Sequence, residues 1–353
     1  MLFTTSICGN YLPRAIALGE SIKWHYPGAK FFPCLLERTV PADAFSAFSG
    51  ILLAKDIVPY SFEHFIFRHT IVEAATAVKG DLMLYLFKAF PEEDIFIYLD
   101  PDTYLYSDFP ELEALLNDHS IVLTPHLVSR SNFIPMEVSI LEHGLYNLGF
   151  LALHRSDEAV NLLEWWKDRL HRMCYDAKYT GIFTDQKWFD LAPLFFKTKF
   201  LMHAGYNVGP WTLNSRIATT DENGNILISG QPLRFIHFSG FPNTFYHCAN
   251  NWPPTGKEIL IELADAYADK LQENKSFACL PWSYGRYLDG RRISEFARIA
   301  WRRFPVDGDV SPFSLSNRKI LGKLCFLSPF DILYRKLYGR FYTMMRSYFR
   351  VWE

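Results

Sequence analysis

The sequence of 353 residues lacks the usual signatures of zinc binding, membrane spanning and nucleic-acid binding. Its six cysteines are scattered without a C-x-x-C pair, which argues against structural zinc and a disulfide framework and fits a reducing compartment. No window of about 20 uninterrupted apolar residues occurs, so no membrane-spanning helix is expected. The net charge of −2 gives no general attraction to nucleic acid, which is therefore disfavoured as a partner.

A secretory signal is not expected either, because no basic segment and apolar core precede the first strand-like residues, 2–8. These absences favour a cytoplasmic location. The tail over 312–353 is basic and aromatic, as in helices that bind anionic membranes. If it binds lipid, the protein would be peripheral on the inner face of the plasma membrane. The alternative is a tail that packs on the body of the protein with a solvated basic face.

What the chain does contain is enough apolar material for a sizeable core. Apolar residues make up 49% of the sequence and charged residues 21%, which is typical of a globular protein. Aromatic residues reach 17%. That surplus has two interpretations, either large packed cores or rings that stack on sugars or lie at a membrane interface.

Strand and helix signals alternate along the chain. We expect strands over 2–8, 30–36, 95–99, 121–125, 144–154 and 233–238, and helices over 10–26, 71–90, 157–170, 257–271 and 293–304. This alternation predicts the α/β class, with a mixed, mostly parallel, Rossmann-like sheet flanked by helices. The predicted domains are 1–250, which would carry the site, and 251–353, a mainly helical extension.

Local signals refine this plan. Asn10 is expected to cap the first helix, and the apolar positions from Ala15 to Trp24 should face the sheet. Ser156 should cap the helix that follows it. The segment Asp221–Asn225 contains Asn-Gly and predicts a hairpin turn.

The most informative stretch is Ile95 to Thr103, in which an apolar run ends in Asp100-Pro101-Asp102. Such a run is typical of a buried strand, and ligands bind where strands end in an open α/β sheet. A turn at Pro101 would bring both carboxylates around one cation. Carboxylate oxygens suit Mg²⁺ or Mn²⁺, ions that also hold phosphate oxygens. The pattern predicts a metal–diphosphate site, with merely solvated carboxylates as the alternative.

Five motifs occur in an order that resembles a known group of enzymes. They are Asn10-Tyr-Leu-Pro13, Tyr98-Leu-Asp100-Pro-Asp102, Asn147-Leu-Gly149, Asp185-Gln186 and a late His237. Over roughly residues 1–245 the chain is similar to glycosyltransferases of the GT-A type, in particular family 8 and related bacterial cell-surface polysaccharide enzymes. Each motif is unspecific alone, but five in this order are hard to obtain by chance.

The resemblance implies a divalent metal, Mn²⁺ or Mg²⁺, on Asp100 and Asp102, with His237 completing its shell. Such an ion would neutralise charge that builds on a leaving diphosphate. Without the resemblance, a lone histidine after a strand is more often structural. The lysine that usually follows this histidine in the family is absent here, because Phe241-Pro242 follows Ser239-Gly240.

The resemblance also implies a nucleotide-sugar donor, for which a UDP-sugar is the expectation. The first strand and turn would hold its base and ribose. The residues expected to bind the donor, besides the metal ligands, are Thr4, Ser6, Asn10, Tyr11 and Gly240. Tyr11 could stack on the base, or its ring could cover the core at the start of a helix.

Four residues are implied in catalysis: Lys79, Asn147, Asp185 and Gln186. Lys79 matches a basic residue near the donor sugar and diphosphate, although it could also be a solvent-facing lysine that ends a helix before Gly80. In a retaining reaction the leaving phosphate would take the acceptor proton, with Gln186 lining the sugar. In an inverting reaction Asp185 would be the general base. The resemblance favours retention; the structural alternative for Asp185 is a helix-start carboxylate.

The expected acceptor is a saccharide or a lipid-linked glycan, and Asn207, Trp211, Trp252 and Trp282 are candidates for contacting it. The sequence thus predicts a metal-dependent, hexosyltransferase-like enzyme of cell-surface polysaccharide (for example lipopolysaccharide) synthesis. One alternative is a non-catalytic sugar- or nucleotide-binding scaffold with the same fold. The other is a sugar nucleotidyltransferase, which would need a glycine-rich phosphate loop where this chain has a single glycine, Gly9.

Overall fold

The computed structural model describes residues 1–41, 46–59, 61–130, 133–303 and 310–314, together with Lys319, Leu321 and Leu337. Two compact units result. The first comprises Met1–Val58 and Glu73–Trp282, and the second comprises Pro59–Val72 and Ser283–Glu353. The first unit carries every residue predicted for the site. The predicted domain boundary at residue 250 stays a prediction.

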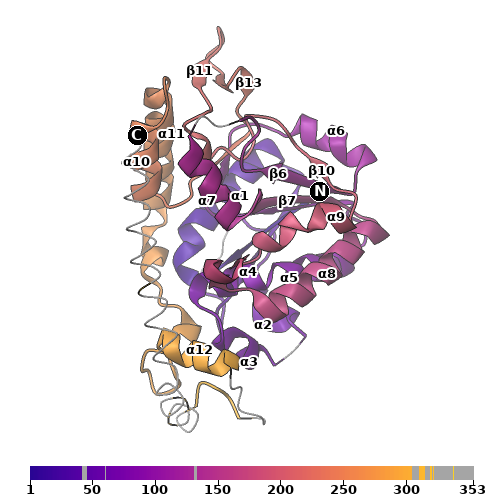
Figure 1. Cartoon of the computed structure of the whole chain (residues 1–353), viewed down its shortest axis with the longest axis vertical. Coiled ribbons are helices and arrows are strands. Elements are labelled where there is room, and N and C mark those ends of the chain that lie inside the picture. The colour runs from indigo at the N-terminus through magenta and orange to yellow at the C-terminus, as the bar shows by residue number, and fades with distance from the viewer. Residues whose placement is uncertain are drawn as a thin grey trace. The chain divides into compact units, whose positions relative to one another are not determined.

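A seven-stranded sheet forms the centre of the first unit (Figure 1). Its strands, in spatial order, are β10 (Lys199–Phe200), β6 (Ile121–Pro125), β7 (Tyr146–His154), β4 (Ile95–Leu99), β1 (Leu2–Ile7), β2 (Lys30–Leu35) and β3 (Leu52–Leu53). Neighbouring strands pair in parallel except at β7, which runs antiparallel to both β4 and β6. The mixed, mostly parallel α/β sheet predicted from the sequence is confirmed.

The central strands are buried because both faces of the sheet are covered. All six residues of β1 are buried, as are four of the five residues of β4. A strand buried on both sides has a continuous apolar sequence and not an alternating one. This is why 95–99 could be recognised as a strand from the sequence, whereas 2–7 contains the buried polar residues Thr4, Thr5 and Ser6.

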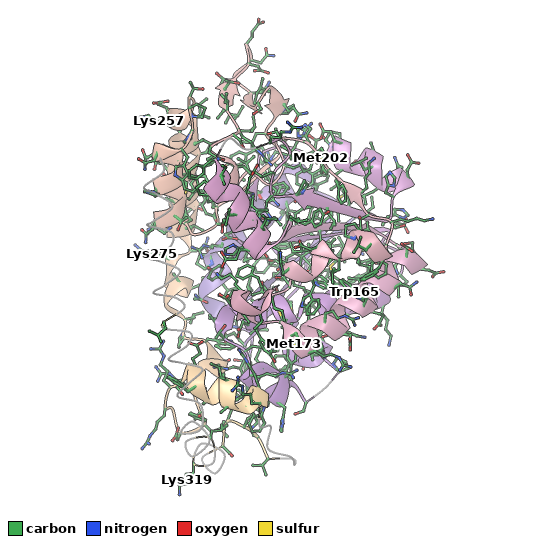
Figure 2. All side chains as sticks on the ribbon, in the orientation of Figure 1. Trp165, Met173, Met202, Lys257, Lys275 and Lys319 are labelled. Carbon is green, nitrogen blue, oxygen red and sulfur yellow. The ribbon has the colours of Figure 1, made fainter. Side chains whose placement is uncertain are left out.

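Helices α5 (Lys79–Ala89) and α8 (Asp157–Met173) lie side by side against the sheet (Figure 1). Gly80 permits their close approach, because a Cβ at this position would lie 2.8 Å from the Cα of Lys167. Ser156 caps α8 as predicted, accepting a hydrogen bond from the backbone of Ala159. On the same helix Trp166 is fully buried, whereas Trp165, labelled in Figure 2, is partly exposed.

The remaining helices are mostly short. They are α1 (Leu12–His25), α2 (Ala54–Ile57), α3 (Phe62–Phe67), α4 (Ile71–Ala77), α6 (Pro110–Asp118), α7 (Ile134–His143), α9 (Ala192–Phe195), α10 (Asn243–Asn251), α11 (Lys257–Glu273) and α12 (Glu295–Arg303). Single 3₁₀ turns cover Gly9–Tyr11, Lys178–Thr180, Lys187–Asp190, Pro210–Thr212, Lys275–Cys279 and Ser283–Gly285.

Three small sheets complete the first unit. They pair β5 (Thr103–Leu105) with β14 (Phe235–His237), β8 (Asp176–Ala177) with β9 (Ile182–Phe183), and β12 (Ile226–Ile228) with both β11 (Ala218–Thr220) and β13 (Gln231–Pro232). The carboxylate of Asp221 accepts the backbone N–H groups of Asn223 and Asn225. This confirms the hairpin turn predicted for 221–225.

The second unit is organised around a buried arginine. Arg298 of α12 donates to the carbonyl oxygens of Phe67 and Tyr284, at 2.9 and 2.8 Å. The rings of Phe67, Trp301 and Phe313 pack beside it. The tail predicted over 312–353 lies largely outside the described residues. None of the helices in the described part of the chain has the length and apolar content needed to span a bilayer.

Two local predictions were wrong, and one alternative is excluded. The first helix begins at Leu12, and Asn10 lies in the preceding 3₁₀ turn and does not cap it. Trp24 is 82% exposed, because the apolar stripe of α1 ends at Ile22. The region 71–90 contains two helices, and Lys79 begins the second of them as a buried residue. Lys79 is therefore not a solvent-facing lysine at a helix end.

Candidate functional site

The site lies where β4 ends. Asp100 follows this strand directly, and its backbone N–H donates to Gly149 O on β7 at 2.8 Å. Three residues later, at Thr103, the chain enters β5, which pairs antiparallel with β14 so that Thr103 lies opposite His237. The backbone N–H of Phe238 also donates to Asp102 O, at 2.7 Å. This pairing places the late histidine beside the two aspartates.

Asp100, Asp102 and His237 offer ligand atoms that all lie within 4.8 Å of one another. His237 Nε2 is 3.2 Å from Asp102 Oδ1 and 3.8 Å from Asp100 Oδ2. The histidine is buried, and the two carboxylates are partly exposed. Oxygen donors suit Mg²⁺ and Mn²⁺, and the imidazole nitrogen favours Mn²⁺ of the two. The structure therefore brings together the three residues predicted as metal ligands, which could hold a divalent ion.

Gly149 lets the predicted metal ligands pack closely against β7. A Cβ at this position would lie 2.8 Å from Asp100 Oδ2 and 2.7 Å from Asn147 Oδ1, and still closer to the ring of His237. Real Cβ atoms do not approach other atoms this closely. The close approach of these side chains over Gly149, with convergent oxygen and nitrogen donors, fits a divalent cation.

We expect Gly149→Ala to weaken binding of Mn²⁺ by at least about tenfold, because the added methyl group displaces the ligand side chains. The effect should appear in titrations of the protein with Mn²⁺. Gly28→Ala is the matched control, since a Cβ at Gly28 meets nothing within 4 Å. Equal Mn²⁺ affinities for the two variants would show that the space over Gly149 does not serve a metal.

Within the cluster, neighbouring charges outweigh the effect of burial on the pKa values of Asp102 and His237. Burial acts to raise the pKa of Asp102, but His237 and Arg14 outweigh it, so this pKa is lowered from its usual value. Burial likewise acts to lower the pKa of His237, and the carboxylates of Asp102 and Asp100 reverse this and raise it. Asp102 thus remains a carboxylate, and protons compete with a metal for the imidazole.

Lys79 stands behind Asp100. Its side chain is 2% exposed, and Nζ lies 3.2 Å from Asp100 Oδ1, 2.8 Å from Asp185 Oδ2 and 2.9 Å from Leu148 O. Burial acts to lower the pKa of Lys79, but the two carboxylates outweigh it and hold this pKa well above its usual value. One buried ammonium therefore links the predicted metal ligand Asp100 with the predicted catalytic residue Asp185.

Tyr98 is a member of this network that the sequence did not single out. Its hydroxyl donates to Asp100 Oδ1 at 3.0 Å and lies 2.8 Å from Ser6 Oγ, while its ring lies beneath Lys79 Nζ. Ser6 in turn donates to Ala75 O, and the buried Thr4 hydroxyl donates to Phe32 O. Both hydroxyls predicted to bind the nucleotide are thus engaged inside the protein, and their role toward a nucleotide stays a prediction.

Asn147 and Gln186 are joined to one another and to the backbone. Asn147 Nδ2 donates to Gln186 Oε1 at 3.4 Å, and Gln186 Oε1 also accepts the N–H of Leu148 at 3.2 Å. Gln186 Nε2 donates to His143 O at 3.1 Å. Asp185 is 3% exposed, and burial raises its pKa more than Lys79 lowers it. The four residues predicted as catalytic therefore lie in one contiguous cluster behind the metal ligands.

The predicted nucleotide-binding turn lies at the start of α1. Asn10 and Tyr11 are partly exposed, and the guanidinium of Arg14 lies 4.3 Å from the centre of the Tyr11 ring. Arg14 also donates to Phe241 O at 2.8 Å, next to Gly240. Gly240 has a φ of 68°, which favours glycine. A cation thus lies between the predicted base-stacking ring and the segment that follows His237.

The residues predicted to contact an acceptor are dispersed. Asn207 is 1% exposed and bonds to other site residues. The Trp211 ring lies edge-on between His126 and His237, with both ring centres at 5.2 Å. Trp252 packs near Phe133, and Trp282 donates to Leu36 O. Of the four, Asn207 and Trp211 lie at the metal ligands; Asn207 is buried and hydrogen-bonded within the protein.

Comparisons with known proteins add the following findings. No family model matches the chain. It is 30% identical to the uncharacterized protein YfnF of Bacillus subtilis strain 168 over 154 residues, which are 43% of this chain and 51% of that protein. It is 25% identical to the uncharacterized protein YfnD of the same organism over 179 residues, which are 49% of this chain and 55% of that protein. The chain thus spans about half the length of these relatives.

Among solved structures, the chain is similar to the galactosyltransferase LgtC in complex with donor and acceptor sugar analogues, at 16% identity and a TM-score of 0.42, covering 75% of this chain and 96% of that one. It is also similar to the apo glycosyltransferase GlyE of Streptococcus pneumoniae, at 14% identity and a TM-score of 0.44, covering 78% of this chain and 64% of that one. Both of these proteins are named as glycosyltransferases. Likeness at this level leaves the reaction to be inferred from the residues of the site.

Proposed function

We propose that this protein is a metal-dependent glycosyltransferase that moves a sugar from a nucleotide-sugar donor, a UDP-sugar, to a saccharide or lipid-linked glycan in cell-surface polysaccharide synthesis. The observation that carries the proposal is the convergence of Asp100, Asp102 and His237 where β4 ends. This edge of an α/β sheet is where such folds bind ligands. A divalent cation held by carboxylates also takes oxygen ligands from a diphosphate.

The residues have distinct roles in this proposal. Asp100 and Asp102 would hold Mn²⁺ or Mg²⁺ together with His237. When bound, the ion supplies Lewis-acid stabilisation to the leaving diphosphate. Lys79 keeps Asp100 Oδ1 occupied, so that only Oδ2 faces His237. Tyr11 and Arg14 lie at the start of α1, where an aromatic ring and a cation suit a base and a diphosphate.

Transfer with retention of configuration is supported by the burial of Asp185 and by its ion pair with Lys79. A general base has to reach the acceptor hydroxyl, but Asp185 is buried and lies 2.8 Å from Lys79 Nζ. We assign Asp185 to holding Lys79, not to taking a proton. The acceptor proton would then pass to an oxygen of the leaving diphosphate as the bond to the sugar breaks. Gln186, fixed by three hydrogen bonds, would line the face of the sugar.

A panel of nucleotide-sugars tests the proposal. With Mn²⁺ present, we expect one donor to raise the unfolding temperature and to be hydrolysed slowly without acceptor, releasing its nucleoside diphosphate. A donor at 100 times its Kd adds about 2.7 kcal/mol of stability. Removing Mn²⁺ with a chelator should abolish both effects. Binding of a donor without hydrolysis would favour the scaffold alternative, and binding of no nucleotide at all would overturn the proposal.

Association with a membrane is a separate part of the proposal, based on the basic and aromatic sequence of 312–353. A chain shortened to residue 311 should lose binding to vesicles that contain anionic lipid. Unchanged binding would remove the tail from the proposal without affecting the assignment of the site.

A further inference from the structure

A buried chain of carboxamides lies behind His237. Asn207 Nδ2 lies 3.0 Å from Asn147 Oδ1 and 2.8 Å from Thr124 Oγ1, and Asn207 Oδ1 lies 3.3 Å from His237 Nδ1. Asn147 continues the chain to Gln186. Asn207 is 1% exposed, so these contacts are made without competition from bulk water.

The orientation of each amide follows from one backbone group. Gly149 N–H can only donate, and it donates to Asn147 Oδ1 at 3.1 Å. Asn147 Oδ1 therefore accepts, and the Asn207 atom that faces it has to be the NH₂ group. The Asn207 oxygen is then left facing His237 Nδ1. Because an amide oxygen can only accept, Nδ1 has to carry a hydrogen.

The proton on Nδ1 decides what the other ring nitrogen can do. With Nδ1–H bonded to Asn207, the lone pair of Nε2 points toward Asp102 Oδ1 and Asp100 Oδ2 once Nε2 gives up its proton. Histidines that bind metals are commonly oriented in this way by a partner on the second nitrogen. The ring of Trp211 packs edge-on against the imidazole of His237, and the ring of His126 packs against Trp211. These contacts restrict rotation of the His237 imidazole.

The backbone of Asn207 supports the same role. Its φ is 49°, in the left-handed region that asparagine tolerates better than most residues. The backbone on either side is tied to the strand that carries His237, because Val208 O accepts the N–H of His237 at 2.8 Å. The side chain of Asn207 is thus held at a fixed place beside the imidazole.

We infer that Asn207 is a positioning residue that holds His237 with Nδ1 protonated and Nε2 directed to the metal position. The inference rests on the proposed function only in requiring a metal at Asp100, Asp102 and His237. It gives Asn207 a different role from the acceptor contact considered from the sequence.

The first test needs no metal. In the full chain labelled with ¹⁵N in its histidine rings, we expect a slowly exchanging Nδ1–H signal that disappears in His237→Gln, which assigns it. Asn207→Gly should also abolish it, since glycine accepts a φ of 49° and only the amide is lost. Thr124→Val is the matched control, because it removes a contact on the far side of the same amide and should keep the signal. A signal that survives in Asn207→Gly would overturn the inference.

The second test uses Mn²⁺ and Mg²⁺. Asn207→Gly should weaken Mn²⁺ binding about 10–100-fold and Mg²⁺ binding less, since Mg²⁺ depends mainly on oxygen ligands. The nitrogen modulation in the pulsed EPR spectrum of bound Mn²⁺ should be lost in Asn207→Gly and retained in Thr124→Val. Equal losses for both ions would mean general damage and would overturn the inference. If the unaltered protein shows the Nδ1–H signal but binds neither ion, the proposed function fails and the positioning of the ring stands.

Discussion

Asp102→Asn is expected to lower the rate constant of donor hydrolysis and transfer by about 10²–10³, or roughly 2.7–4 kcal/mol of transition-state stabilisation. The substitution keeps the size of the side chain and removes the negative charge that faces His237 Nε2 at 3.2 Å. Affinity for Mn²⁺ should fall with it, as measured by titration. The fold should persist, because Asp102 is partly exposed and the amide oxygen of asparagine can still accept a hydrogen bond from His237.

Asp102 is a better choice than Asp100 for this experiment. Asp100 Oδ1 accepts from Tyr98 and lies beside the buried Lys79, so its loss would disturb folding as well as metal binding. Asp118→Asn provides the matched control, since Asp118 is exposed at the end of α6. A near-normal rate in Asp102→Asn, with Mn²⁺ still bound, would show that the metal site has been assigned to the wrong residues.

Lys79→Met is expected to reduce the free energy of unfolding by about 3–5 kcal/mol, because it leaves the buried carboxylate of Asp185 without its cation. Methionine fills a similar volume, so packing is largely kept. The side chain of Asp185 is only 4% exposed and has no access to water that could replace the ammonium. Urea unfolding followed by tryptophan fluorescence measures the change.

A double variant separates charge from packing. Lys79→Met combined with Asp185→Asn removes both members of the buried pair and should recover a large part of the loss. Lys30→Met is the control for an exposed lysine, because Lys30 pairs with Glu92 and Glu93 at the surface and its loss should change stability little. A Lys79→Met protein as stable as the Lys30→Met protein would contradict the buried ion pair.

The strands and the acidic motif could be predicted because each is encoded over a short distance. Ile95–Leu99 is an uninterrupted apolar run followed by Asp100-Pro101-Asp102, and this pattern alone predicts a metal site at the end of β4. His237 was added by resemblance to a family. No local pattern distinguishes it from a structural histidine, since its place beside Asp102 depends on the pairing of β5 with β14.

The hydrogen bonds and ion pairs inside the site could not be predicted from the sequence. Lys79 has the local sequence of a surface residue, and its burial results from two carboxylates that approach from β4 and from the segment after β9. Tyr98 lies within an apolar run, and its sequence context does not distinguish it from other strand residues. Asn207 resembles a saccharide contact until its partners on β6, β7 and β14 are known. Such roles depend on tertiary neighbours, which periodicity and residue type do not report.

The direction of β7 has a consequence for how this protein can change during evolution. Because β7 runs opposite to β4, the residues that open it, Asn147 to Gly149, meet the end of β4 at Asp100. The connection between α7 and β7 at 144–145 therefore borders the predicted site residues, and a Cβ at Gly144 would lie 3.2 Å from Gln186 Cγ. The hairpin tip at 221–225 is instead set by its own hydrogen bonds. We therefore expect insertions in the first connection to displace Gln186 and Asn147, and length changes in the second to leave these residues in place.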